Sequence, residues 1–473
     1  MSGSRIFRVA KNSAILGLQQ VAVNLLSIVV VGYVARSLGK VDYGIFSLAF
    51  TFSIFFAFLG QLGLRTLTIR EVARERGKAN VYLGKIIPAR ILLIGIMTAV
   101  IPMVAMIMQY DKKAVYIIFI AALANMFEQL SKIISDIFQA NEEMGKVAVR
   151  DILVRIFTGV ASIVVLKVGC GLVTVSWVYV IGAMLGLSFN AYLYNRRFEF
   201  PALSVDLKFI WTNIKEGLSF MLLGMASTMY TNVDVFLISK IQDLQSVGVY
   251  NAAANLFYRL SFVADAVATA SFPAIAQLYW KDYQGASEVM SKSINGIILL
   301  SVPTAIGGWL LADDIILLIF GQEYLLSADV FKILIVSVPF LFISLQIRYS
   351  LGAIKLQGTV LKVVLVGLVV NIVLNCIVIP IYGVIGAACA TLFTEILTFI
   401  WLAVLASKHF ILAGMFRGIR LMSLPLTLMV LVVFLDPLNN IIIRIVFGAL
   451  SYVGALYILG KDEISPYFKM LKK

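Results

Sequence analysis

Long blocks of apolar residues run through the whole chain and leave only short polar connections between them. A helix needs about 20 apolar residues to cross the hydrocarbon core of a bilayer. At about 33 residues for a span and its loop, 473 residues have room for about fourteen spans. The pattern therefore predicts an all-α polytopic membrane protein without a sizeable soluble domain.

The composition excludes an ordinary soluble domain. Hydrophobic residues make up 61% of the chain and charged residues 14%, with a mean hydropathy of +0.97. Soluble domains are roughly 45–50% apolar and about 25% charged. The remaining polar residues are too few to build a surface that faces water.

We expect two lobes of six helices each, followed by two C-terminal helices. The N-lobe would take residues 1–200, the C-lobe 201–410, and the last two spans with a tail 411–473. The expected spans are 14–35, 45–64, 91–108, 115–136, 152–168, 173–194, 218–240, 249–277, 295–311, 333–351, 363–379, 386–405, 421–435 and 441–459.

Lysine and arginine are concentrated in one alternating set of loops, for example Arg70, Arg74 and Lys85. The positive-inside rule places that set in the cytoplasm, together with both termini. The net charge of +14 therefore indicates orientation in the plasma membrane and not a nucleic-acid partner. Membrane lipids are the expected surroundings, and we expect a monomer to be functional.

A short internal repeat is present. Residues 42–49 and 246–253 each place a glycine, a β-branched residue and an aromatic residue in succession at the start of a span. Because six spans would separate the two copies, the halves would have the same orientation. Transporters built from such parallel repeats bind substrate between the halves and alternate which side is open.

Several segments, in their order along the chain, resemble those of one transporter family. They are ARSLGKVDYGIF (35–46), REVAR (70–74), DVFLIS (234–239), VGVYNAA (247–253), IFGQEY (319–324) and IPIYGVIGAA (379–388). The set is similar to the oligosaccharide flippases of the multidrug/oligosaccharidyl-lipid/polysaccharide superfamily, relatives of the lipid II flippase. The resemblance implies a two-lobed transporter of fourteen helices. Its cargo would be a polyprenyl-diphosphate-linked oligosaccharide, moved from the cytoplasmic to the outer leaflet by alternating access.

Cations inside the expected spans are the candidate substrate ligands. A charge at mid-membrane costs at least about 2.5–3.5 kcal/mol on insertion scales, so each one needs a reason. Arg259 lies near mid-depth of its span and has a planar fork that suits a phosphate. A structural pair with Asp265, or with an acid on another helix, is the alternative. The resemblance adds that an arginine in this helix lines the cavity of lipid II flippases.

Four more cations could meet the substrate. Arg348, near the end of its span, could line the cavity or extend to the headgroups. Arg36 and Arg65 could guide a diphosphate at the two mouths or anchor the chain at the interfaces. Lys132 could point at the substrate with Glu128 holding it, or could form a self-neutralised stripe with its neighbours at i±4.

A second set of polar side chains predicts a cation site. Asp234, Asn371, Asn375 and Thr394 offer hard oxygen ligands within expected spans. These groups could bind a coupling sodium ion or proton, and the resemblance implies a cation site among these helices. Hydrogen bonding between helices is the alternative.

The sequence argues against an enzyme and against a bound cofactor. His409 is the single histidine, and neither a Walker A loop nor a dinucleotide fingerprint occurs. A multidrug/cation antiporter of the same superfamily is the nearest alternative, and an integral membrane glycosyl- or phosphotransferase is the next. The outer loops are too short and too poor in acids to favour the latter.

Overall fold

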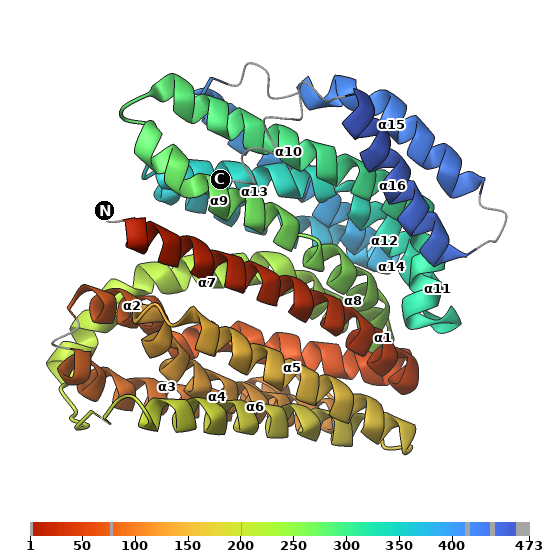
Figure 1. The fold of residues 1–473 in the computed structure, drawn as a ribbon. Helices are drawn as coiled ribbons and strands as arrows, with labels where there is room; N and C mark the ends of the chain where they lie inside the picture. The colour runs from red at the N-terminus through yellow and green to blue at the C-terminus, as the bar shows by residue number, and fades with distance from the viewer. Residues whose placement is uncertain (1–2, 76–78, 200, 412–416, 436–439, 460–473) are drawn as a thin grey trace. The chain divides into compact units, whose positions relative to one another are not determined.

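The computed structural model describes residues 3–75, 79–199, 201–411, 417–435 and 440–459, and its regular elements are helical throughout these ranges (Figure 1). The predicted all-α fold class is confirmed. The chain forms two compact units, Met1–Asn251 and Ala252–Lys473. The lobe boundaries expected from the sequence, at residues 200 and 410, stay a prediction.

The first unit is built around the helix α4. Helix α4 packs against α1, α3 and α6, while α1 also packs against α5 and α7 (Figure 1). The helices are α1 (Gly3–Gln61), α2 (Leu64–Arg74), α3 (Ala79–Ile107), α4 (Lys112–Ala140), α5 (Met144–Lys167), α6 (Leu172–Asn195) and α7 (Leu207–Ile241). Helix α8 (Leu244–Arg259) begins in this unit.

The second unit is arranged around α10 and α13. Helix α13 packs against α9, α10 and α14, and the hairpin of α15 and α16 packs through α15 on α10. The helices are α9 (Phe262–Leu278), α10 (Tyr283–Leu310), α11 (Ala312–Phe320), α12 (Leu325–Val336), α13 (Val338–Ala353), α14 (Gln357–Ser407), α15 (Arg417–Phe434) and α16 (Ile441–Leu459).

By length and hydropathy, eight helices in the described ranges can cross a membrane, or nine if the pair α12 and α13, bent by 44°, is one span. Two of these helices each carry two expected spans. Helix α1 is broken at Gly39 (φ 73°) and α14 at Gly383 (φ 60°), backbone conformations that glycine adopts readily. The remaining expected spans fall on α5, α7 and α15, which are shorter or carry more polar residues.

The exterior of both units is apolar. Leu92 on α3 and Val369 on α14 are 64% and 58% exposed, and many other large apolar side chains are likewise uncovered. Soluble monomers rarely expose apolar patches of this extent, whereas lipid tails cover them without cost. The chain is therefore a multi-pass membrane protein.

The two copies of the internal repeat touch each other. A Cβ built on Gly44 would lie 1.7 Å from the carbonyl oxygen of Leu244, and one built on Gly248 would lie 2.2 Å from that of Lys40. The contact is reciprocal, because each glycine faces the residue four positions before the other. Backbones approach this closely only because positions 44 and 248 carry no side chain.

Replacing Gly44 or Gly248 by alanine should lower the unfolding temperature of the purified protein in detergent. The added Cβ would overlap a backbone carbonyl, and overpacking typically costs about 1–3 kcal/mol. Gly95→Ala on α3 is the control, because its Cβ would meet nothing within 4 Å. Equal unfolding temperatures for all three variants would contradict a tight crossing.

Candidate functional site

Asp136 on α4 is the centre of a buried ion cluster in unit 1. Its two carboxylate oxygens accept bonds from Arg65 Nε on α2 and Arg90 Nη2 on α3, each at 2.9 Å. Asp136 and Arg90 are almost fully buried, whereas the Arg65 side chain is 41% exposed. One carboxylate thus ties three helices together and leaves an excess positive charge.

A second ion cluster joins α4 to α5. Glu128 accepts two bonds from the buried Arg150, one of them from Nη1 at 3.0 Å, and Arg150 also binds Asp151 at 2.9 Å. Lys132 Nζ lies 3.7 Å from Glu128, and its side chain is 35% exposed. The strong partner of Glu128 is therefore Arg150, and Lys132 is only loosely held.

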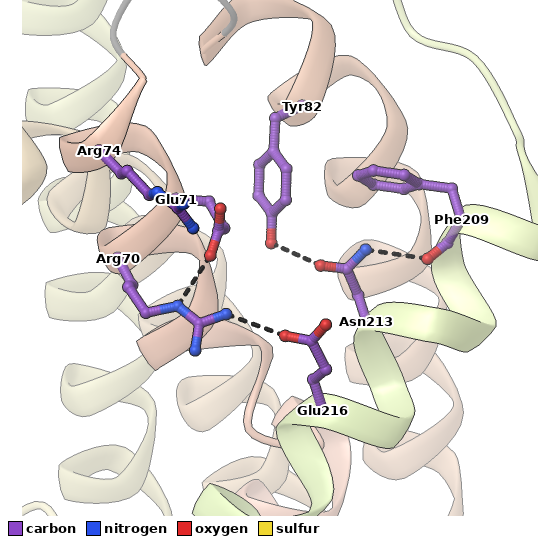
Figure 2. A pocket seen from close by; sticks show the side chains of 7 residues that line it. All are labelled: Arg70, Glu71, Arg74, Tyr82, Phe209, Asn213 and Glu216. Carbon is purple, nitrogen blue, oxygen red and sulfur yellow. Dashed lines mark hydrogen bonds and ion pairs between the residues drawn. The ribbon is translucent and has the colours of Figure 1, made fainter.

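An open pocket of about 480 Å³ lies between α2, α3 and α7 (Figure 2). We call this end of unit 1 the basic end, because it carries the cations Arg65, Arg70, Arg74, Lys85, Lys208 and Lys215. The pocket lining consists of Arg70, Glu71, Arg74, Tyr82, Phe209, Asn213 and Glu216.

Hydrogen bonds hold the lining of this pocket in place. Arg70 donates from Nε to Glu71 at 2.8 Å and from Nη2 to Glu216 at 2.9 Å (Figure 2). These bonds, first the one to Glu216 and then the one to Glu71, raise the pKa of Arg70. Tyr82 donates to Asn213 at 3.0 Å, and Asn213 donates to the carbonyl of Phe209 at 2.9 Å.

The start of α7 is fixed beside the pocket. Asp206 caps the helix by accepting from the backbone N–H of Phe209 at 3.0 Å and also binds Lys85 at 2.9 Å. The backbone bond and then the lysine lower the pKa of Asp206. Capping satisfies one of the free N–H groups at the helix start, so the chain begins α7 at Leu207.

The predicted substrate cations lie in both units. Arg259 is half-buried and ends α8, directly before a two-residue break that separates it from α9. Arg348 is half-buried on α13, and Arg36 is exposed on α1. Asp265, the alternative partner considered for Arg259, lies 3.5 Å from the hydroxyl of Tyr349.

The predicted cation ligands are buried. Asp234 accepts a bond of 2.5 Å from the hydroxyl of Tyr250, and both residues belong to unit 1. In unit 2, Asn375 donates to the carbonyl and side-chain oxygens of Asn371, both at 3.0 Å, and Thr394 donates to Ala390 at 2.7 Å. Whether Asp234 and these groups share one cation stays a prediction.

The sequence matches the polysaccharide biosynthesis protein family over residues 9–279, more than half of the chain. The chain belongs to the polysaccharide biosynthesis protein family. Residues 221–377 also match the MatE family. The predicted superfamily is thereby confirmed, and the chain is a member of a transporter family and not an enzyme.

Among the relatives of this chain is a probable low-salt glycan biosynthesis flippase of Haloferax volcanii. The two are 31% identical over 163 residues, which are 34% of this chain and 34% of that protein. Another relative, an uncharacterized membrane protein of Methanocaldococcus jannaschii, is 26% identical over 51% of this chain. The matched part spans between 34% and 48% of the lengths of these relatives.

Solved structures establish the fold. The lipid II flippase MurJ in its inward closed conformation aligns with a TM-score of 0.77 at 18% identity, over 94% of this chain and 99% of that one. An inward-facing multidrug resistance MATE family transporter aligns with a TM-score of 0.65 at 14% identity, over 83% and 98%. The chain therefore has the fold of these transporters.

Sequence reasoning missed Arg90, Arg150 and the pocket of Figure 2. Both arginines stand at the edges of apolar blocks, where they look like the loop cations used for orientation. One signal could have revealed them. The expected span on α4 places two acids, Glu128 and Asp136, beside the single Lys132, so at least one acid needs a cation from another helix. The pocket gave no local signal, because its lining residues come from three separate segments.

Replacing Asp136 by asparagine should strongly destabilise the protein. Asparagine has nearly the same shape but leaves the buried Arg90 without a counter-charge, and breaking a buried pair costs about 3–5 kcal/mol. The unfolding temperature in detergent measures the loss. Asp329→Asn is the control, because Asp329 is 59% exposed and lies 3.6 Å from Lys332. Equal losses for the two variants would refute the central role of Asp136.

Proposed function

We propose that the protein is a flippase for a polyprenyl-diphosphate-linked oligosaccharide, which it moves from the cytoplasmic to the outer leaflet by alternating access. Membership in the polysaccharide biosynthesis family, over more than half of the chain, carries this proposal. The relative in Haloferax volcanii, described as a probable glycan biosynthesis flippase, supports the same class of cargo. In this proposal the basic end of unit 1 and both termini face the cytoplasm.

Half-buried cations in the membrane helices support a cargo with a diphosphate. Arg259 and Arg348 in unit 2 and Lys132 in unit 1 are each partly exposed inside an apolar helix bundle. Charges at such positions are expensive and typically line a polar pathway. The lipid tail could remain in the bilayer while these cations compensate the charge of the crossing head.

Replacing Arg259 by alanine should reduce transport of the lipid-linked oligosaccharide at least about tenfold, because one charged contact to a phosphate is lost. Flipping into the outer leaflet of proteoliposomes measures transport, and immunoblotting measures abundance. Arg259→Lys should retain part of the activity, since it keeps the charge but not the fork. Lys408→Ala, at an exposed position of unit 2, is the matched control. Normal flipping by the Arg259→Ala variant would remove Arg259 from the substrate path.

We further propose that transport is coupled to a sodium ion or a proton through Asp234. Asp234 is buried and accepts a short bond from Tyr250. A buried acid in a membrane helix is unfavourable, so its presence supports a functional role for this carboxylate. The amides Asn371 and Asn375 and the hydroxyl of Thr394 are buried oxygen ligands of the same hard type.

Asp234→Asn should abolish the dependence of flipping on a sodium or proton gradient. The amide has the same shape but neither binds a cation strongly nor titrates. Flipping rates in proteoliposomes with and without each gradient measure this effect. Asp265→Asn is the control in another helix, and it should keep the gradient dependence. A gradient dependence that survives in the Asp234→Asn variant would rule out coupling through Asp234.

A multidrug/cation antiporter is the second candidate, because residues 221–377 match the MatE family. An antiporter for cationic drugs should expose carboxylates to its cargo, whereas a flippase for a diphosphate should expose cations. Drug efflux by the purified protein, with no movement of lipid-linked oligosaccharide, would favour the antiporter.

A further inference from the structure

The pocket of Figure 2 holds hydrogen-bonding groups that its own network does not use. Arg70 binds one oxygen of each glutamate, Oε1 of Glu71 and Oε2 of Glu216. The second oxygen of each carboxylate has no partner within the described part of the chain. Arg74 likewise makes no ion pair with any described residue, and Figure 2 shows it at the rim beside Glu71.

This mixture of charges restricts the class of ligand. Two arginines and two glutamates line one small space, so a purely anionic headgroup would meet the carboxylates and a cationic drug would meet the arginines. A sugar satisfies both, because its hydroxyl groups donate to carboxylates and accept from guanidinium groups. A phosphate next to the sugar would use the uncommitted Arg74.

The shape and walls of the pocket also suit a sugar. Its volume of about 480 Å³ lies within the range of roughly 300–1,000 Å³ usual for small-molecule sites. The ring of Phe209 lies 5.4 Å from that of Tyr82, and together they give the otherwise polar pocket an apolar wall. Such sites combine an aromatic surface with a few fixed polar groups.

The neighbouring part of α7 places the pocket at headgroup depth. Trp211 is 59% exposed, and Lys215 Nζ lies 5.5 Å from the centre of its ring. Leu207, one turn before, is exposed as well. Exposed tryptophan next to lysine is typical of the membrane interface. A lipid-linked head in the same leaflet would therefore reach the pocket without leaving the membrane surface.

We propose that this pocket is a docking site for a sugar of the lipid-linked glycan, next to its phosphate, before the head enters the transport path. The proposal rests on the proposed flippase function and adds a site at the basic end of unit 1. Glu71 and Glu216 accept hydrogen bonds from sugar hydroxyl groups, and Arg74 binds the phosphate.

Competition between two lipids tests the site. The purified protein in nanodiscs receives the lipid-linked oligosaccharide fraction extracted from its own cells, together with sugar-free polyprenyl diphosphate. Native mass spectrometry then measures how much of each lipid is retained. The wild type should retain the glycosylated lipid in preference. Glu216→Gln should reduce this preference about tenfold, since hydrogen bonds to charged groups are strong, and should leave retention of the bare diphosphate unchanged.

Two further variants sharpen the assignment. Arg74→Ala should weaken retention of both lipids, because both carry the phosphate. Lys208→Ala is the matched control, since it removes an exposed cation from the same end outside the pocket lining. The variants Glu216→Gln, Arg74→Ala and Lys208→Ala should all keep the wild-type unfolding temperature. The changed groups are exposed, and surface charges contribute little to stability.

The outcomes separate the two proposals. A wild-type protein that retains and flips no glycosylated lipid would refute the flippase function. A wild type that retains it would refute the pocket alone if Glu216→Gln keeps the full preference and Arg74→Ala retains both lipids as strongly as the wild type. Retention of anionic phospholipids that depends on Arg74 and not on Glu216 would identify a lipid headgroup site and overturn the sugar assignment.

Discussion

The bonds of Asp136 to two arginines determine how the basic end of unit 1 is built. Helix α2 is too short and too polar to be held by lipid, and Arg65 fastens it to α4 through this carboxylate. Arg90 on α3 donates to the other oxygen of the same carboxylate and so fastens α3 to α4 as well. Because α2 carries Arg70, Glu71 and Arg74, the position of this short helix decides where the pocket lining stands.

Burial divides the charges of the helices into two groups. Arg90 and Arg150 are almost fully buried and form ion pairs with carboxylates, so their charge is neutralised within unit 1. Lys132, Arg65 and Arg259 are partly exposed. Buried pairs of the first kind keep the helices in register, whereas cations of the second kind remain accessible from outside the helix bundle.

Much of the fold followed from the sequence, because the apolar blocks and their helical length are local properties. Each expected span is largely helical, even where α1 and α14 join two of them across Gly39 and Gly383, and where the span 249–277 is divided between α8 and α9. The partners of charges were harder to predict. The i+4 spacing of Glu128 and Lys132 suggested a local pair, yet the closer partner is Arg150 on the next helix. Pairing between helices depends on rotation and depth, which a single sequence does not encode locally. The site residues proposed for substrate and cation stay predictions for the same reason.

The reciprocal glycine contact gives the internal repeat a physical meaning. A chance similarity of eight residues would not require its two copies to meet, and still less with each glycine against the residue four positions before the other. The expectation of two parallel repeats, drawn from the sequence, predicts such a contact between equivalent segments. Small residues at such a crossing allow close backbone packing without interlocked side chains. Gly44 and Gly248 therefore determine how closely the two backbones cross within unit 1.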